Sequence, residues 1–521
     1  MHKVFRHYDP NQDFLIPPSL DDWLDKDHLA RFVAELVDEV LDLSSFLASY
    51  KEPRGYPPYD PRLMLKVLLY GYVTGVRSSR ALERACRDVV AFRWLAANQA
   101  PDFRSIARFR RRHLVALRQL FRASLELCQA AGMVRLGLVA LDGTKVRANA
   151  SRRKAMSYRH LSEKAQVLAE EVDKLLKDAE IQDTREDKAF GKDRRGDEVP
   201  KHLQRKEQRL AAMKQAKADL EARARQAAAD KAEQKAADKG LSEAETATLV
   251  DAAIAAAVPK PTDQASFTDP AARIMKTADG SFHYCYNAQA VVCGAHQVVV
   301  ATALSNRSAD CPELKAMLGQ VKENTGAIPK TLLADAGYFS EDNVTAAATA
   351  GVDPLIAPGR LRHGEEPPPA PRGRIPAHLS TKARMARKLR TKAGRAAYKQ
   401  RKAIVEPVFG QIDTCHGGKR LLLRGHAAAE AEWHLMVAAH NLRKRAFHLT
   451  GPTLVDDLLS RDVPQVGVPS WAGGPRSQEA WEAASLGSAR RSARGSALVR
   501  GQLRVRAPGR REAPDCATCV G

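Results

Sequence analysis

The chain has 521 residues, enough for about three to four domains. No apolar run approaches the roughly 20 residues that cross a bilayer, and the first residues carry no apolar segment typical of a secretory signal, so we expect neither a membrane protein nor an exported one. Lys and Arg number 83 against 61 Asp and Glu, which gives a formal net charge of +22. This charge favours a polyanionic binding partner, and nucleic acid is the first candidate.

The eight cysteines are scattered without a recurring spacing, which is typical of reduced thiols in a cytoplasmic protein. Cys516 and Cys519 form a single CxxC near the end of the sequence. A structural zinc site needs four ligands, so this pair alone does not predict one.

Residues 1–130 are predicted to form a helical domain. Apolar residues recur at helical spacing over 24–43, and Asp60 followed by Pro61 is typical of a helix start at which the carboxylate caps the first turn. A later helix, with Asp102 as its cap, carries four arginines: Arg108, Arg110, Arg111 and Arg112. This run fits either a solvated face or a contact with DNA.

The composition changes sharply after the next segment. Residues 135–148 predict an apolar strand that turns at Asp142 and Gly143. Residues 160–257 are rich in Ala, Lys, Glu, Gln and Arg, and two apolar seams at heptad spacing predict an antiparallel, coiled-coil-like helical hairpin, with a partly disordered charged linker as the alternative. The seams are Leu168, Val172, Leu175 and Ala179, and Leu203, Leu210, Met213 and Leu220.

Strands and helices then alternate along the chain. Strands are predicted over 281–292 and 296–304, which a tight hairpin joins, within 330–340 as a buried strand, and at 353–358. A helix is predicted over 311–326, and another follows the buried strand. This order predicts a mixed α/β sheet with one connection interrupted by the helical hairpin.

The segment 360–402 is strongly basic, with fourteen Lys or Arg against Glu365 and Glu366. It begins as a proline-rich loop and is then predicted to be helical as far as Pro407. A run this dense and of one sign, beside a sheet, favours a phosphate-binding surface over a merely solvated face. Residues 465–521 lose periodicity and are predicted to form a disordered basic tail.

Three acidic residues stand where such a sheet would place a site. Asp142 and Asp335 each follow a predicted strand, and Glu406 lies in the basic helix. Taken singly, they have ordinary explanations, since Asp before Gly favours a turn and Glu406 can pair with Lys402 one helical turn earlier. Together they fit a metal site, because cutting a phosphodiester needs an activated water and a stabilised leaving oxygen, and two Mg²⁺ held by a few carboxylates supply both.

Six segments carry a more specific signal. They are YDPRLMLKVLLYGYVTGVRSSRALERACR with PDFRSIARFRRRH, then ALDGTKVRANAS, DPAARIMKTADGSFHYCYNAQAVV, LLADAGYFS, RKAIVEPVFGQI, and RLLLRG with WHLMVAAHNLRK. In this order, over about residues 5–450, they resemble the DDE transposases of bacterial insertion sequences.

The resemblance implies a ribonuclease-H-like catalytic domain over 131–450, interrupted by 160–257 and preceded by a helical DNA-binding domain over 1–130. It implies that Asp142, Asp335 and Glu406 are catalytic and hold two Mg²⁺, with Mn²⁺ able to substitute. The activity implied is binding, cleavage and strand transfer of double-stranded DNA at the terminal inverted repeats of the protein's own element. The implied assembly is a homodimer or larger on paired ends, in the bacterial cytoplasm and associated with the nucleoid.

The residues expected to contact DNA are Tyr398, Arg401, Lys402, Lys145, Arg420 and Arg424. The family commonly has a Tyr and an Arg before the glutamate and a Lys seven residues after it. Tyr398 fits, whereas Arg401 lies one residue farther from Glu406 than is usual, so that Lys402 can take its role. Asp413 replaces the later lysine, and Lys419 with the two following arginines can compensate for it.

Two alternatives stay open. Another nuclease of the same fold would cut DNA without joining it, and an inactive copy would occupy the element ends without cutting. The intact set of Asp142, Asp335 and Glu406 argues against an inactive copy, whereas Asp413 and the unusual tail argue mildly for one.

Overall fold

The computed structural model describes residues 19–50, 57–151, 155–190, 201–239, 242–359 and 378–450, together with residues 369, 373 and 376. The predicted tail, with Cys516 and Cys519, and most of the proline-rich start of the basic segment lie outside the described residues. No helix within the described ranges is long and apolar enough to cross a membrane.

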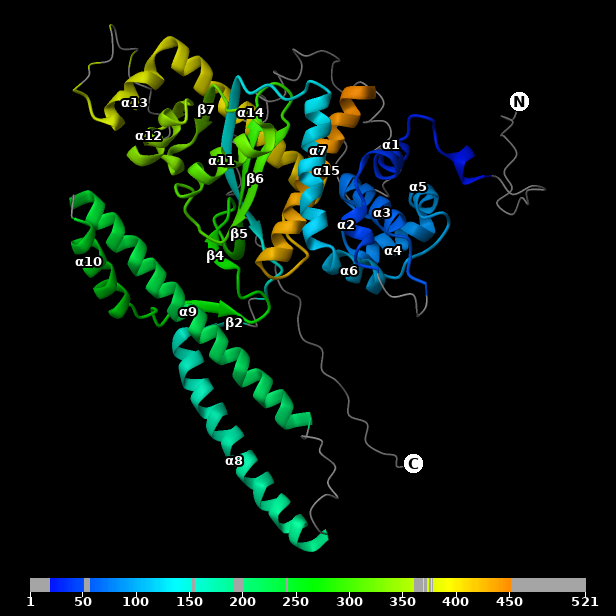
Figure 1. The fold of residues 1–521 in the computed structure, drawn as a ribbon, viewed down its shortest axis with the longest axis vertical. Coiled ribbons are helices and arrows are strands. Elements are labelled where there is room, and N and C mark those ends of the chain that lie inside the picture. Colours follow the sequence, from blue (N-terminus) through cyan, green and yellow to red (C-terminus); the bar gives the residue numbers. More distant parts are fainter. Residues whose placement is uncertain are drawn as a thin grey trace, which may run out of the picture. The chain divides into compact units, whose positions relative to one another are not determined.

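The N-terminal region is helical, as predicted (Figure 1). Its elements are η1 (Leu20–Trp23), α1 (Leu29–Glu35), η2 (Leu36–Val40), α2 (Ser44–Leu47), α3 (Pro61–Thr74), α4 (Ser79–Asp88), α5 (Val90–Leu95), α6 (Phe103–Arg112) and α7 (Leu114–Ala130). Asp60 caps α3 and Asp102 caps α6, as the sequence indicates. The helical spacing predicted within 24–43 corresponds to α1 and η2, which begin after the turn between Asp25 and His28, where the His28 side chain caps α1.

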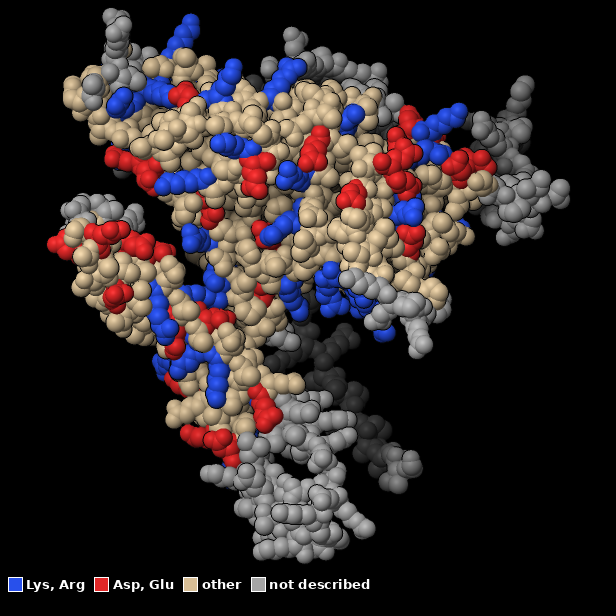
Figure 2. Space-filling view, viewed as in Figure 1, with Lys and Arg blue, Asp and Glu red and all other residues tan. Residues whose placement is uncertain are grey.

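The arginine run of α6 divides between core and surface. Arg110 is only 2% exposed and donates to the Arg77 carbonyl and to Ser79 Oγ, each at 2.8 Å, so it holds neighbouring helices together. Arg108, Arg111 and Arg112 are exposed. Figure 2 shows basic side chains gathered along this edge of the helical region.

The centre of the fold is a mixed six-stranded sheet. Its strands are β1 (Leu138–Arg147), β4 (Arg273–Lys276), β5 (Phe282–Cys293), β6 (Val299–Ser305), β7 (Thr331–Ala334) and β8 (Asp353–Ile356). The order is β4–β5–β1–β7–β8, and β6 also pairs with β5. β1 runs antiparallel to β5 and parallel to β7, and β7 runs parallel to β8. The mixed sheet predicted from the alternating pattern is therefore confirmed.

The sequence predicted a turn at Asp142 and Gly143, but β1 does not turn there. It continues straight, with these residues opposite Ala290 and Gln289 of β5. Gly143 is needed for close approach instead, because a Cβ there would clash with the Gln289 side-chain nitrogen. The buried strand predicted within 330–340, closing in a turn, is confirmed: β7 ends at Ala334, and Ala336–Tyr338 forms a 3₁₀ turn (η4).

Five helices follow the strands of the second half: α11 (Glu313–Thr325), α12 (Glu341–Thr349), α13 (Thr381–Arg390), α14 (Lys392–Thr414) and α15 (His426–Thr450). α14 passes through Pro407, where the sequence predicted a stop. Proline has no N–H to donate one turn back, so the Ala403 carbonyl loses its helical partner. Gln297 Nε2 donates to that carbonyl at 3.1 Å, which compensates for the loss and lets the helix continue.

The insertion between β1 and the rest of the sheet is helical. It comprises α8 (Tyr158–Phe190), α9 (Lys201–Lys239) and a third helix, α10 (Glu243–Ala255), that the sequence did not predict. β2 (Ala155–Ser157) pairs with β3 (Gln264–Ser266) and closes the base of the insertion. Val172 of α8 and Leu210, Met213 and Leu220 of α9, all of them residues of the predicted seams, belong to one buried apolar cluster between the two helices. The side chains of Leu175, Ala179 and Leu203 lie outside the described set, and coiled-coil geometry stays a prediction.

The helical region and the sheet share one hydrophobic core. α15 packs against α7, α3 and β6, and its Trp433 indole donates to Thr302 Oγ1 at 2.7 Å. Glu432 of the same helix is buried and forms an ion pair with Arg77 at 3.0 Å. Packing and a buried charge pair therefore fix α15 between the two regions. The predicted boundary near residue 130 stays a prediction.

Candidate functional site

Asp142 and Asp335 lie at the same level of two neighbouring strands. The parallel register pairs Leu141 of β1 with Ala334 of β7, and each aspartate is the next residue along its strand. Because side chains at matching positions of adjacent strands share a face, the two carboxylates come together at the end of β7. The Asp335 carboxylate accepts from Gly337 N at 2.8 Å, and that of Asp142 from Gly143 N at 2.9 Å. The structure thus brings together two of the three predicted acidic residues.

Burial, a second carboxylate and one guanidinium set the electrostatics of this pair. Burial raises the pKa of Asp142, and the nearby charge of Asp335 raises it further, against the opposing effect of Arg401. Asp142 Oδ2 accepts from Arg401 Nη1 at 2.8 Å, and the two side chains are 21% and 12% exposed. A cation is therefore already favoured beside Asp142, and Arg401 supplies it.

Arg401 comes from α14, which packs against β1, β5 and β7. Burial alone would lower the pKa of its guanidinium, but the charges of Asp142, Tyr398 and Asp335 raise it above the ordinary value. Tyr398, one turn earlier, is half-buried, and burial raises the pKa of its phenol. Lys402 is exposed. Of these expected DNA contacts, Tyr398 and Arg401 lie at the carboxylates and Lys402 faces solvent.

Glu406 does not join the aspartates in this structure. It is exposed on α14, while its neighbours Val405 and Val408 are buried. Five residues separate it from Arg401, which at about 100° per residue turns the two side chains to different faces of the helix. Within the described residues, no group of three or more His, Cys, Asp or Glu is arranged to hold a metal ion. The three-carboxylate site stays a prediction.

Four polar residues beside the aspartates were missed in the sequence. Asp310 Oδ1 accepts from Asn287 Nδ2 at 2.7 Å, from Gln289 Nε2 at 3.0 Å and from Lys145 Nζ at 3.0 Å. Tyr338, just after Asp335, donates its hydroxyl to Gln289 Oε1. The available signal was the alternation of Asn287 and Gln289 within an otherwise apolar strand, which places two amides on one face.

The remaining predicted DNA contacts gather near the end of β1. Lys145 is held by Asp310, whereas Arg420 and Arg424 are exposed and both donate to Asn149, at 3.1 Å to Oδ1 and 3.0 Å to the carbonyl. Backbone hydrogen bonds from Arg147 to the segment 419–421 fix this arrangement. At Asp413, where the family has lysine, burial raises the carboxyl pKa and Lys419 partly opposes that rise.

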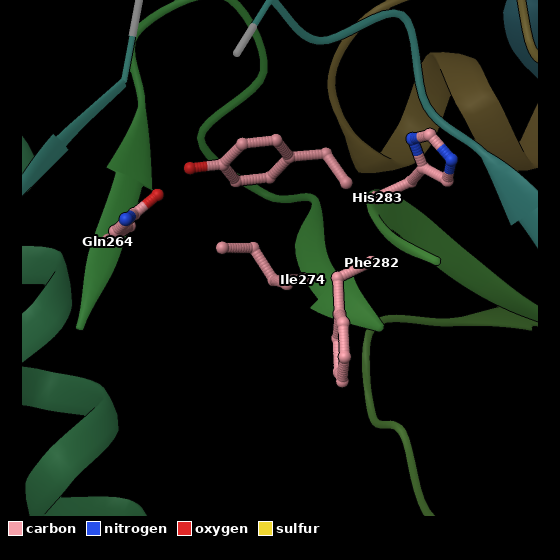
Figure 3. Close-up of a pocket in the computed structure, with 5 residues that line it drawn as sticks. Gln264, Ile274, Phe282 and His283 are labelled. Atoms are coloured by element: carbon pink, nitrogen blue, oxygen red, sulfur yellow. The ribbon is translucent and has the colours of Figure 1, made fainter. Parts of the chain in front are cut away.

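A pocket of about 290 Å³ lies elsewhere, where β3, β4 and β5 meet (Figure 3). It is lined by Gln264, Ile274, Phe282, His283 and Tyr284. Its β5 residues precede Ala290, the partner of Asp142, by six to eight positions, about 20–26 Å along a strand. The lining includes no carboxylate, so this pocket is not the candidate catalytic site.

Comparison with protein families gives two matches in the order that the motifs indicate. Residues 18–112 match a transposase domain (DUF772), and residues 243–442 match a transposase DDE domain. The second match contains Asp335 and Glu406 but begins after Asp142. No match was found among curated proteins or among solved structures. With a transposase domain and a transposase DDE domain matched in this order, the chain belongs to the DDE-type transposases of insertion sequences.

Proposed function

We propose that this transposase cuts DNA at the terminal inverted repeats of its own element and transfers the freed 3′ ends to target DNA. The observation that carries the proposal is the pairing of Asp142 and Asp335 at the end of β7, beside the basic helix α14. The strand order supports a ribonuclease-H-like catalytic domain, because β6, β1, β7 and β8 all run in one direction and β5 alone among these neighbours opposes them.

The donor chemistry of the two aspartates fits a divalent cation, since their carboxylates repel each other and already attract a guanidinium. Asp142 and Asp335 would hold Mg²⁺ or Mn²⁺, and the family motif assigns Glu406 as the third ligand. When bound, the metal ions supply positive charge for activating the nucleophile and stabilising the leaving oxygen. Arg401, which pairs with Asp142 in the structure, would then be available for a DNA phosphate.

DNA would be held mainly through its backbone. Exposed basic residues of α14 and of the segment after it, among them Lys402, Arg420 and Arg424, suit phosphates, which give affinity and register rather than sequence specificity. The N-terminal helices would bind the inverted repeats. Holding two ends at once requires a dimer or larger assembly.

The helical insertion would contact a second protomer or DNA in that paired-end complex. The pairing of β2 with β3 brings the two ends of the insertion side by side. A short linker can therefore replace residues 158–262 while β2 and β3 stay paired. A shortened protein that still pairs two ends normally would refute this role.

The test uses the DNA that flanks the reading frame on both sides. The purified protein is incubated with it and Mg²⁺, and breaks are mapped to the nucleotide for the wild type, Asp142→Asn and Glu406→Gln. Asp342→Asn, which alters an exposed carboxylate of α12, is the matched control. Paired breaks at inverted repeats, lost in the two site variants alone, support the proposal. Breaks unrelated to any repeat indicate a general nuclease, and binding without breaks indicates an inactive copy.

A further inference from the structure

Two amides are buried on the central strand beside the aspartates. Asn287 and Gln289 of β5 are fully buried, and they lie opposite Lys145 and Gly143 of β1. Gln289 Nε2 donates to Asn287 Oδ1 at 3.0 Å, and both amides donate to Asp310. Burying an amide is unfavourable unless its hydrogen bonds are made, and Asp310 accepts one from each of these amides.

The same network reaches the other aspartate. Tyr338 is fully buried three residues after Asp335, and its hydroxyl donates to Gln289 Oε1. A Cβ on Gly337 would lie 3.0 Å from Asp335 Oδ1 and 3.4 Å from Asp310 Oδ2, so the two carboxylates approach the same point. Asp310 is thus linked to the turn that carries Asp335, as well as to β1.

We propose that Asp310 is a positioning residue for the Asp142–Asp335 pair. Through Lys145 it fixes the end of β1, and through Gln289 and Tyr338 it fixes the turn after β7. Its Oδ1 accepts N–H groups from Lys145, Asn287 and Gln289, and these bonds are the route by which it would act. The inference rests on the proposed function, because positioning has a purpose only if the two aspartates hold a metal.

The chemistry of the network argues against a role in packing alone. Replacing buried polar groups by well-packed apolar ones is often neutral or stabilising, so stability does not require a carboxylate, two amides and a phenol at this place. Fully satisfied polar networks fix one geometry. Residues that hold metal ligands in place typically contribute about 10–100-fold to metal affinity.

The experiment measures Mn²⁺ binding to the full chain without DNA, by the EPR signal of free Mn²⁺. The variants are Asp310→Asn and Tyr338→Phe, which keeps the ring and removes only the donor. Asp342→Asn is the matched control, because Asp342 is an exposed carboxylate that likewise pairs with a lysine, Lys315. Asp142→Asn is the reference for loss of a ligand. Denaturant unfolding of each metal-free protein is measured in parallel.

We expect Asp310→Asn to weaken Mn²⁺ binding about 10–100-fold, Tyr338→Phe to weaken it several-fold, and Asp342→Asn to leave it unchanged. Variants that unfold more easily but bind Mn²⁺ as the control does would overturn the proposal. If Asp310→Asn does not fold, Tyr338→Phe decides by the same criterion. Wild-type protein that binds no Mn²⁺, or whose binding ignores Asp142→Asn, would contradict the proposed function itself and remove the basis for a positioning role.

Discussion

Two ion pairs of the described residues have similar lengths but differ in how deeply they are buried. Arg77 and Glu432, at 3.0 Å, join the N-terminal helices to α15, and their side chains are 8% and 0% exposed. Glu432 also accepts from Tyr72 OH at 3.3 Å and from the backbone N–H groups of Leu422 and Leu423 at 2.7 and 2.8 Å. Arg401 and Asp142, at 2.8 Å, lie at the end of the sheet, where the carboxylate accepts from one other donor, Gly143 N.

We call Arg77–Glu432 the structural pair and Arg401–Asp142 the exchangeable pair, because the two carboxylates differ in what else binds them. Both Glu432 oxygens are bound by groups that cannot leave without unfolding the core. Asp142 instead lies beside a second carboxylate, and under the proposed function a divalent cation would replace Arg401 there. Charge is buried for stability in the first region and kept available in the second.

The largest effect is expected from Asp335→Asn in the exchangeable region. Exchanging carboxylate for amide removes the charge that holds the metal, and losing several kcal/mol of transition-state stabilisation corresponds to about 10³-fold in cleavage rate. DNA affinity measured in EDTA should stay within about twofold, because no phosphate contact is lost. Single-turnover cleavage and filter binding on the same DNA separate the two quantities. A variant that cuts at the wild-type rate would remove Asp335 from the site.

In the structural pair, Glu432→Gln should lower the free energy of unfolding by about 3–5 kcal/mol, because Arg77 stays buried without a counter-charge. Arg401→Gln should cost only about 1–2 kcal/mol, since Asp142 is partly exposed and can be hydrated. Urea unfolding of both variants gives the comparison directly. Equal losses of unfolding free energy in the two variants would show that both ion pairs contribute to stability in the same way.

The sequence predicted the elements of the exchangeable region better than their orientation. Asp142 and Asp335 were identified because each follows an apolar strand, and parallel strands bring such positions together. Asp310 was missed because its partners, Lys145 and Gln289, come from distant parts of the chain, and no local pattern indicates which side chains meet. The face on which Glu406 lies depends on how α14 packs, which helical periodicity alone does not set.

Two other features of the fold were harder to predict for a related reason. Arg110 looked like part of a solvated or DNA-binding run, yet it is buried, because its partners are the Arg77 carbonyl and Ser79 on other helices. Pro407 was predicted to end its helix because proline cannot donate a backbone hydrogen bond. The Gln297 side chain that compensates belongs to the β5–β6 turn, far away in the sequence, so no local pattern indicates it. Local signals hold where the partner is local, as for the caps Asp60 and Asp102.

Acid should weaken the structural region first. Burial lowers the pKa of His416 to about 4 and those of His434 and His440 to about 3, with nearby cations adding to the effect. Because each folded-state pKa lies below the unfolded value near 6.5, the stability is fully present above pH 6.5 and is lost as the pH falls toward 4. The contribution of Asp142 to stability changes with pH in the opposite direction, because its raised pKa makes the folded state more stable as the pH falls.

Each of these histidines should add a slope of up to about 1.4 kcal/mol per pH unit to the free energy of unfolding between pH 6.5 and 4. His440→Gln, which keeps a donor for the Gln297 carbonyl, should lower stability at pH 8 but make this slope shallower by one histidine's share. Urea titrations at pH 8, 7, 6 and 5 measure both. An unchanged slope would show that His440 is not the group that titrates.

The smallest effect concerns the exposed cations around the exchangeable pair. Lys402 lies next to Arg401 but faces solvent, so Lys402→Gln should remove one phosphate contact and reduce the slope of log affinity against log salt by about 0.9. Lys315→Gln, which alters an exposed cation of α11 that already pairs with Asp342, should leave that slope unchanged. Arg401→Gln is the informative third variant. If Arg401 binds a DNA phosphate only after leaving Asp142, its substitution should reduce the salt slope in Mg²⁺ and leave it unchanged in EDTA. An equal reduction under both conditions would show that Arg401 contacts DNA whether or not the carboxylates hold a metal.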